Sequence, residues 1–238
     1  MSSPKVYLIL GTRDSGRRAI LLDLLSDLPN SENSLYFRDA ETPPAKTDAE
    51  LETIESLHSC QFSLNTCKIE HASISMKGSP SKIFFLPDET RDPADTVEGL
   101  QAWLKKNNCT LTRVLSVVDC QRIFSQPESQ SWHDACMHFS DMVLLNRRES
   151  VATQWLQDWL NAQKKIFHPT RFELVKKNKV RNPADVLDQQ VFRKSLFFDS
   201  LTSIDADAFE EDTPEDLKPD LYIQRLENGK RIKPIPAL

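Results

Sequence analysis

The sequence predicts a three-layer α/β fold, in which a doubly wound and mostly parallel sheet lies between helices. Two observations predict it. Strand-like runs alternate with amphipathic helical segments along the chain, and the central runs are continuously apolar, as expected for strands buried on both faces. The clearest of these runs are 5–10, 82–86, 113–119 and 141–146. With 238 residues, 39% of them hydrophobic, the chain can form one sizeable core.

The first unit of this fold is a strand over 5–10, a polar loop over 11–18 and a helix over 19–28. The helix is predicted by apolar residues at helical spacing, from Ile20 to Leu28. Further along the chain we expect strands at 35–37, 68–76 and 172–175, and helices at 47–57, 93–106 and 149–165.

The predicted α/β domain covers residues 1–200, and 201–238 form an acidic linker with a short basic tail. Residues 205–220 hold eight acidic side chains and a single basic one, Lys218. So little apolar surface predicts a solvated segment. The pair Asn228-Gly229 favours a short hairpin within the basic end.

Composition excludes several classes of protein. No run approaches the roughly 18–20 apolar residues that cross a bilayer, and the N-terminal residues lack the pattern of a signal peptide. The five cysteines include no C-x-x-C pair, so reduced thiols are expected. A net charge of −5 argues against nucleic acid as a partner. These features predict a cytoplasmic protein that binds neither membrane nor nucleic acid.

The loop at 11–18 follows the plan of a phosphate-binding loop. Gly11 and Gly16 have the spacing of G-x-x-x-x-G-K-[ST], and a strand–loop–helix unit directs backbone N–H groups at an anion. Two key side chains differ, because Arg17 replaces the lysine and Arg18 replaces the hydroxyl residue that binds Mg²⁺. Asp14 adds a negative charge, and we expect it to pair with Arg17 or Arg18 and to take the place of the anion. The alternative interpretation is a turn that binds nothing.

A second motif lies at the end of the strand 141–146. Asn146-Arg147-Arg148-Glu149 keeps the order amide, cation, any residue, acid of the N-K-x-D motif that binds guanine in GTPases. The alternative is an ordinary helix start, where Glu149 is favoured by the helix dipole.

Taken together, the chain resembles the CobW-type GTPases, a family of metal-insertion proteins related to the urease and hydrogenase nickel chaperones. The resemblance spans about residues 4–175 and rests on the order and spacing of 92–97, 113–119, 139–146 and His168-Pro169. It implies a P-loop NTPase-like fold and a degenerate nucleotide site. The residues at the matching positions are Gly11, Ser15, Gly16, Arg17, Arg18, Asn146, Arg147 and Glu149.

The sequence also departs from that family. The family's acidic residue after the strand 82–86 corresponds to Asp88, to Glu89 or to neither, and either of the two could position Mg²⁺ or water. The family's C-x-C-C metal motif has no counterpart, and the nearest residues, His58, Cys60 and Cys67, fit no standard zinc spacing.

A further group, His133, Cys136 and His138, lies on one predicted helix. Its spacings of three and two do not place all three side chains on one face. We expect Cys136 in the core and both histidines at the surface, with no metal bound.

Two functions remain open. In the first, the chain is a non-hydrolysing binding or regulatory protein with weak or lost nucleotide binding, which acts on a protein partner as a homodimer or with an intact relative. In the second, it is an active GTPase or metallochaperone that binds GTP or GDP with Mg²⁺ through an unusual loop. A small-molecule kinase is a weaker third alternative, because phosphoryl transfer also needs a lysine or an equivalent cation.

Overall fold

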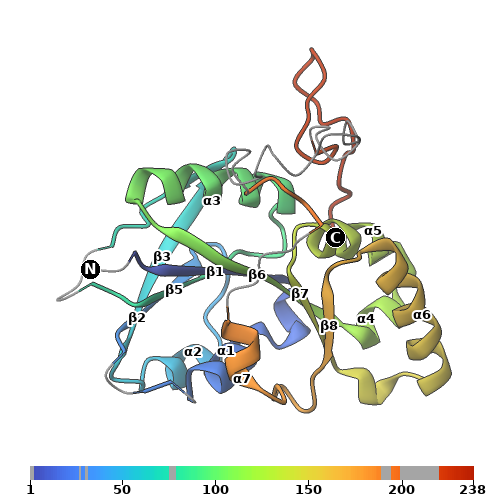
Figure 1. The fold of residues 1–238 in the computed structure, drawn as a ribbon, viewed down its shortest axis with the longest axis horizontal. Coiled ribbons are helices and arrows are strands. Elements are labelled where there is room, and N and C mark those ends of the chain that lie inside the picture. Colours follow the sequence, from blue (N-terminus) through green and yellow to red (C-terminus); the bar gives the residue numbers. More distant parts are fainter. Residues whose placement is uncertain (1–2, 27, 30–31, 75–78, 189–193, 199–219) are drawn as a thin grey trace, which may run out of the picture.

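The computed structural model of the chain has three layers, with a central sheet between helices (Figure 1). It describes residues 3–26, 28–29, 32–74, 79–188, 194–198 and 220–238. Within these residues the sheet has eight strands in the order β4-β3-β2-β5-β1-β6-β7-β8. All neighbouring strands pair in parallel except β3 and β4, which pair antiparallel. The predicted fold class is therefore confirmed.

The strands of this sheet are short, and most of them are buried. They are β1 (Lys5–Gly11), β2 (Ser34–Asp39), β3 (Leu57–Asn65), β4 (Lys68–Glu70), β5 (Lys82–Leu86), β6 (Thr110–Asp119), β7 (Met142–Asn146) and β8 (Arg171–Leu174). The helices are α1 (Arg17–Ser26), α2 (Lys46–Leu51), α3 (Pro93–Asn107), α4 (Cys120–Ser125), α5 (Gln130–His138), α6 (Thr153–Ile166) and α7 (Pro183–Leu187). Short 3-10 turns are η1 (Arg13–Ser15), η2 (Pro127–Ser129) and η3 (Arg148–Ser150).

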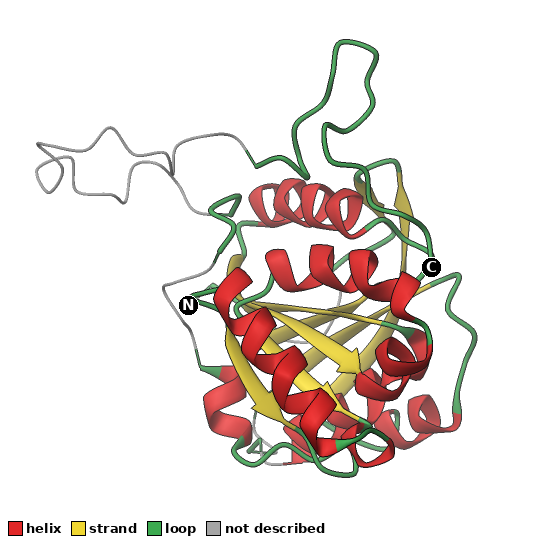
Figure 2. Cartoon of the chain, turned by 90° about the vertical axis from the view of Figure 1, so that its right-hand side faces the viewer, coloured by secondary structure: helices red, strands yellow, loops and turns green. Residues whose placement is uncertain are grey.

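Alternate side chains of β1 divide the core between the two faces of the sheet. Val6, Leu8 and Leu10 pack in the cluster that contains residues of α3 and α5. Tyr7 and Ile9 pack in the cluster that contains residues of α1, α2 and α7. Figure 2 shows the strands running between these helices. No helix among the described residues is long and apolar enough to span a bilayer.

The central position of β1 determines where polar loops gather. Leu8 pairs with Phe85 of β5, and Gly11 pairs with Val117 of β6. Because these strands are parallel, the loops that follow β1, β5, β6 and β7 all leave the same edge of the sheet. Ligands of doubly wound sheets bind at this carboxyl edge.

Two expected elements differ from the structure. The helix expected at 47–57 ends as α2 at Leu51, and the strand β3 begins at Leu57. This strand escaped the prediction because polar residues from His58 to Gln61 leave only part of it buried. The strand expected at 68–76 is limited to β4, and residues 75–76 lie outside the described part.

The C-terminal residues form the expected hairpin. Arg225 and Arg231 make an antiparallel bridge, and Gly229 lies between them with φ of 80°. Most of the predicted acidic linker, 201–219, lies outside the described residues. Residues 220–238 lie beside α5 and above it in Figure 1.

Candidate functional site

The loop between β1 and α1 lies at the carboxyl edge of the sheet, and both of its glycines are required by its shape. Gly11 has φ of 135°, and a Cβ there would lie 2.4 Å from the carbonyl oxygen of Val117. Gly16 has φ of 92°, and its Cβ would lie 2.5 Å from Nδ2 of Asn146. L side chains rarely adopt such φ values. The spacing of the two glycines thus corresponds to a real geometric constraint.

Gly16 directly precedes helix α1. Its carbonyl oxygen accepts a hydrogen bond of 2.9 Å from the N–H of Ile20. The preceding N–H groups of the first helical turn have no intrahelical acceptor, and the helix dipole places partial positive charge there. This geometry favours an anion at the loop.

Arg17 lies beneath this loop rather than in its mouth. The residue is 4% exposed, and its Nη1 donates to the carbonyl oxygens of Pro87 at 2.6 Å and Ile9 at 3.3 Å. Burial lowers the pKa of Arg17 to about 10, which leaves the guanidinium charged at neutral pH. The side chain at the position of the phosphate-binding lysine is therefore bound to the backbone at the ends of β1 and β5.

The carboxylate of Glu89, from a distant part of the same chain, binds the backbone of the phosphate loop. The backbone N–H of Arg13 donates to Oε2 of Glu89 at 2.9 Å, and its Nη2 lies 3.0 Å from Oδ2 of Asp88. Oε2 of Glu89 also lies 3.3 Å from Nη1 of Arg122. A loop N–H that could contact a phosphate is thus already paired with a carboxylate of the same chain.

Asp88 is 2% exposed and fully engaged. Besides Arg13, it accepts hydrogen bonds from the Thr42 hydroxyl at 2.7 Å, the Thr90 hydroxyl at 2.9 Å and the Thr90 N–H at 3.1 Å. Burial is the largest influence on its pKa and would raise it. The hydrogen bonds together outweigh burial and lower the pKa of Asp88 to about 2.

These contacts leave no suitable set of ligands for Mg²⁺. The ion requires near-octahedral oxygen ligands, whereas the carboxylates of Asp88 and Glu89 are occupied by hydrogen bonds and ion pairs. Arg18 stands at the position of the metal-binding hydroxyl, with its Nε 3.1 Å from Oδ1 of Asp48 and its Nη2 2.8 Å from the carbonyl oxygen of Pro43. The residues present at this site do not fit a divalent cation.

Asp14 has a different position from the one expected. It is exposed in η1, while the buried Arg17 binds carbonyl oxygens and Arg18 binds Asp48. The carboxylate that reaches the loop N–H comes from Glu89, which lies more than seventy residues later in the chain.

Asn146 and Ser15 stabilise the loop through hydrogen bonds from their side chains. Nδ2 of Asn146 donates to the carbonyl oxygen of Ser15 at 2.8 Å and to Oδ1 of Asn178 at 2.7 Å. The buried hydroxyl of Ser15 donates to the carbonyl oxygen of Thr12 at 2.8 Å. Both side chains therefore act on the loop's own backbone.

The other residues of the second motif point elsewhere. Arg147 has φ of 53°, and its Nη1 lies 3.5 Å from Oδ2 of Asp119. Glu149 is exposed in η3, and no hydrogen bond or ion pair joins it to another described side chain. The structure brings Asn146 to the loop but does not place Glu149 in contact with it.

Little space remains beside the loop. A cavity of about 10 Å³ has room for about one water molecule. Its lining contains four arginines and consists of Arg13, Arg17, Arg18, Tyr36, Arg38, Thr42 and Leu86.

Three residues that hold this region together, Arg13, Asn178 and Asp39, are not among the predicted site residues. Arg13 occupies a variable position of the loop motif, and Asn178 follows the last strand, so no local pattern distinguishes either. Asp39 ends β2 and is fully buried, with its Oδ2 3.0 Å from Nε of Arg91 and 3.3 Å from the N–H of Asp88. The only sequence signal for Asp39 is its position as an acidic residue at the end of a strand.

The candidate metal ligands His58, Cys60 and Cys67 do not form one group among the described residues. His58 is exposed, and Cys60 packs against the core on its own strand. Cys67 instead lies with Asp95 and Glu98, where the three potential ligand atoms are within 4.8 Å of one another. All five cysteines are free thiols.

In the group of His133, Cys136 and His138, the expectation that both histidines lie at the surface was wrong for His133. His133 is 1% exposed rather than at the surface, because it lies on the buried face of α5, and its Nδ1 lies 2.9 Å from the carbonyl oxygen of Ser129. Burial lowers the pKa of His133 to about 4. Cys136 is buried, as expected.

Comparisons with known proteins give matches to solved structures alone. No family model matches the sequence, and no curated protein matches it. The hydrogenase maturation factor HypB from Archaeoglobus fulgidus has a TM-score of 0.50 at 10% identity, covering 72% of this chain and 81% of that one. The Zn(II)-bound GTPase YjiA from E. coli, and a Zn(II)-bound triple mutant of it, each have a TM-score of 0.48 at 10% identity, covering 81% of this chain and 67% of the other.

At this identity the likeness concerns the fold. The HypB structure, at a TM-score of 0.50, supports an α/β fold for this chain with its eight-stranded, mostly parallel sheet. The fold implied by the resemblance, which was drawn from the order of short sequence motifs, is thus confirmed. The chain has a P-loop NTPase-like α/β fold.

Proposed function

We propose that this chain is a non-hydrolysing relative of the CobW-type GTPases, a binding or regulatory protein whose nucleotide binding is weak or lost. The observation that carries the proposal is the internal occupation of the phosphate loop. Arg17 is bound beneath the loop to Pro87 and Ile9, and Glu89 is bound to the N–H of Arg13. A nucleotide phosphate would have to displace Glu89 and would gain no cation from Arg17.

Loss of hydrolysis follows from the same contacts. Phosphoryl transfer depends on a metal ion and cations that neutralise charge around the transferred group. Arg18 is paired with Asp48, and Asp88 is committed to Arg13, Thr42 and Thr90. None of these side chains is free to bind Mg²⁺ or to orient an attacking water.

The alternative is an active GTPase or metallochaperone that binds GTP or GDP with Mg²⁺. It is supported by the conformations of Gly11 and Gly16 and by the start of α1, which keep the backbone geometry of an anion site. In that alternative, nucleotide binding would have to rearrange 87–89.

We further propose that the protein acts in the cytoplasm through a protein partner, without binding nucleic acid or membrane. A homodimer and a complex with an intact relative are the two assemblies we consider. The net charge of −5 supports a partner with a basic surface.

Direct titration with nucleotides tests the proposal. GTP, GDP and ATP at about 1 mM, with and without Mg²⁺, are added to the wild-type chain and to Arg17→Lys/Arg18→Ser. A ligand present at a hundredfold excess over its Kd stabilises a protein by about 2.7 kcal/mol, which raises Tm by about 5–10 °C for a chain of this size. We expect a shift below about 1 °C for the wild type with every nucleotide.

The control is Arg171→Lys/Arg181→Ser, which makes the same two changes at exposed arginines away from the loop. A guanine-selective shift in the wild type, together with Mg²⁺-dependent release of phosphate that Arg17→Ala abolishes, would support the alternative and overturn the proposal. A shift that appears only in Arg17→Lys/Arg18→Ser would locate the loss of binding in these two residues.

A further inference from the structure

The C-terminal hairpin, residues 220–235, is packed against the face of the sheet that carries α3 and α5. Tyr222 is 5% exposed, and its ring lies 4.9 Å from that of His138 and 5.8 Å from that of Phe139. The hairpin is closed by backbone hydrogen bonds such as that from the N–H of Leu226 to the carbonyl oxygen of Lys230, at 2.7 Å. It is thus an ordered element with a small apolar anchor.

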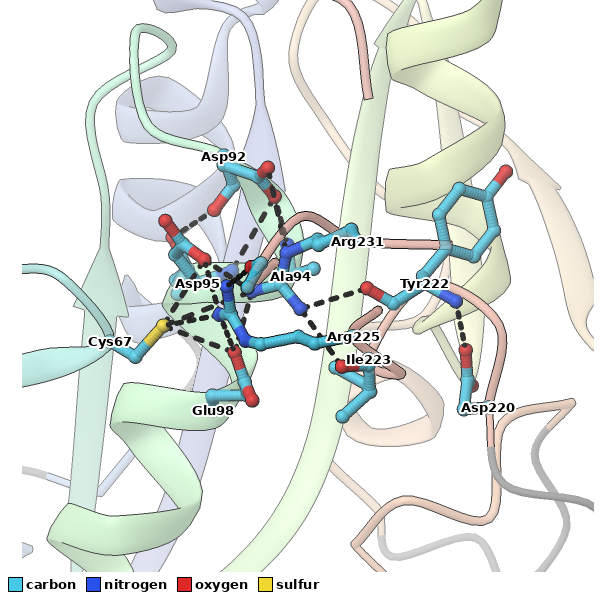
Figure 3. A network of polar contacts seen from close by, with 12 residues as sticks. Cys67, Asp92, Ala94, Asp95, Glu98, Asp220, Tyr222, Ile223, Arg225 and Arg231 are labelled. Atoms are coloured by element: carbon cyan, nitrogen blue, oxygen red, sulfur yellow. Dashed lines mark hydrogen bonds and ion pairs between the residues drawn. The ribbon is translucent and has the colours of Figure 1, made fainter. Parts of the chain in front are cut away.

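Two arginines of the hairpin bind one acidic turn of α3 (Figure 3). Nη2 of Arg231 lies 2.5 Å from Oε2 of Glu98 and also pairs with Asp95. Nη2 of Arg225 lies 2.9 Å from Oε2 of Glu98 and 3.4 Å from Oδ1 of Asp95. Arg231 also donates through Nη1 to the carbonyl oxygen of Tyr222 at 2.9 Å, so one buried guanidinium ties the hairpin both to itself and to α3.

A second attachment lies at the start of the hairpin. Oδ2 of Asp220 lies 2.6 Å from Nε2 of His138 on α5 and accepts a hydrogen bond of 2.5 Å from the Ser195 hydroxyl. The hairpin is therefore held to two different helices. Its outer side is exposed, and Leu221 and Leu226 are 55% and 50% exposed.

The acidic turn of α3 directly follows the segment that closes the phosphate loop. Asp92 is the N-cap of α3, and its carboxylate accepts from the N–H groups of Ala94 and Asp95 and lies 3.9 Å from Nε of Arg231. The five residues before it, 87–91, supply Pro87 to Arg17, Asp88 to Arg13 and Glu89 to the loop N–H. One short segment is thus fixed to the phosphate loop at one end and joined to the hairpin through α3 at the other.

We propose that the hairpin is a latch, which holds segment 87–91 against the phosphate loop and whose release opens that loop to anions. This inference rests on the proposed function and adds its regulation. The latch is releasable because three of its four charged side chains are partly solvated. Those of Arg225, Asp95 and Glu98 are 39%, 32% and 23% exposed, whereas that of Arg231 is 6% exposed. Attractions between such groups weaken with ionic strength or with a competing charged partner. The latched and released hairpins are the two states of the switch.

Hydrogen exchange of the full chain tests the latch directly. The variant Arg225→Gln/Arg231→Gln removes both cations, and Lys105→Gln/Lys230→Gln is the matched control, because it removes two exposed cations that pair with no described acid. In the arginine variant we expect exchange at least tenfold faster in 221–233, in the first turn of α3 and in 87–91. The control should exchange like the wild type.

A second variant distinguishes release of the hairpin from a folding defect within the hairpin itself. Asp95→Asn/Glu98→Gln leaves the hairpin sequence intact and removes its acceptors on α3. It should accelerate exchange in the same three segments. Unchanged exchange in 221–233 in both variants would overturn the latch, and faster exchange there with unchanged 87–91 would overturn its coupling to the loop.

GTP titration of the same variants separates this inference from the proposed function. We expect the apparent Kd for GTP to fall at least fivefold in both latch variants and to stay constant in the control. Tight GTP binding by the wild type would refute the proposed function, while the exchange experiment would still decide whether the hairpin controls 87–91. An unchanged Kd together with faster exchange in 87–91 would show that the latch does not regulate anion access, and would overturn the inference.

Discussion

Two clusters of arginines and carboxylates hold distant parts of this chain together, and they differ in the burial of their carboxylates. In the loop cluster, around Arg13, Asp88, Arg91 and Asp39, the side chains of Asp88 and Asp39 are 1% and 0% exposed. In the hairpin cluster, formed by Arg225, Arg231, Asp95 and Glu98, the acidic side chains are about a quarter to a third exposed. A buried carboxylate that loses its partner has no water to replace it, whereas a partly exposed one does. We therefore expect the loop cluster to support the fold and the hairpin cluster to be open to regulation.

The largest effect should come from Asp88→Ala. This change leaves Arg13 and two threonine hydroxyls without their shared acceptor at a buried site. Breaking a buried pair costs about 3–5 kcal/mol, and each 1 kcal/mol lowers Tm by about 2–4 °C for a chain of this length. Urea unfolding and calorimetry would measure both quantities.

The comparison for Asp88→Ala is Asp95→Ala in the hairpin cluster. Its carboxylate is 32% exposed, and Glu98 still pairs with both arginines after the change, so we expect a loss of about 1 kcal/mol. Equal losses in the two variants would contradict the division of the clusters by burial.

The glycines of the two regions allow a second comparison. Gly16 and Gly229 both have positive φ, but a Cβ at Gly16 would lie 2.4 Å from Oδ1 of Asn178, whereas nothing lies within 4 Å of one at Gly229. Gly229→Ala should cost about 1 kcal/mol for the backbone conformation alone. Gly16→Ala should cost about 2–3 kcal/mol, because Asn146 and Asn178 must also move and lose a buried hydrogen bond. The difference in free energy of unfolding measures how tightly the loop is packed.

His133 of α5 predicts a dependence of stability on pH. Burial lowers the pKa of His133 to about 4, below the value of about 6.5 expected in the unfolded chain. Between these two values the unfolded chain binds more protons than the folded one, so stability falls as the solution is acidified. From pH 7 to pH 5 this one group should remove about 2 kcal/mol.

Urea unfolding at both pH values tests this with two variants. His133→Gln should abolish that part of the acid-dependent loss. His138→Gln, which removes the partner of Asp220 in the hairpin, should retain it. If His133→Gln loses as much stability on acidification as the wild type, the imidazole is not held neutral by burial.

Local patterns and long-range contacts contributed differently to what the sequence could predict. The parallel sheet followed from apolar runs that alternate with helices, and the two loop glycines followed from their spacing, because both signals lie within a few residues. The contact of Arg13 with Asp88 joins residues 75 positions apart and depends on β1 and β5 being neighbours. No local pattern specifies it. The same holds for Glu89, which takes the role expected for Asp14, and for the strand β3, whose polar residues conceal its period.

The variant with the smallest expected effect is the most sensitive test of the difference between the loop cluster and the hairpin cluster. Arg225→Gln removes a cation that is 39% exposed from the hairpin cluster, and Arg231 still satisfies the same carboxylates. The free energy of global unfolding should therefore change by less than about 1 kcal/mol.

An increase from about 0.05 M to 0.5 M NaCl should reproduce most of this change in the wild type, because the Debye length then falls from above 10 Å to below 5 Å. Salt should leave the cost of Asp88→Ala nearly unchanged, since the Asp88 carboxylate is 1% exposed and is also bound by two neutral threonine hydroxyls. Parallel salt titrations of Tm for the two variants would measure the contrast. A strong salt dependence at Asp88 would mean that water reaches this carboxylate, and that the phosphate loop is more open than its contacts indicate.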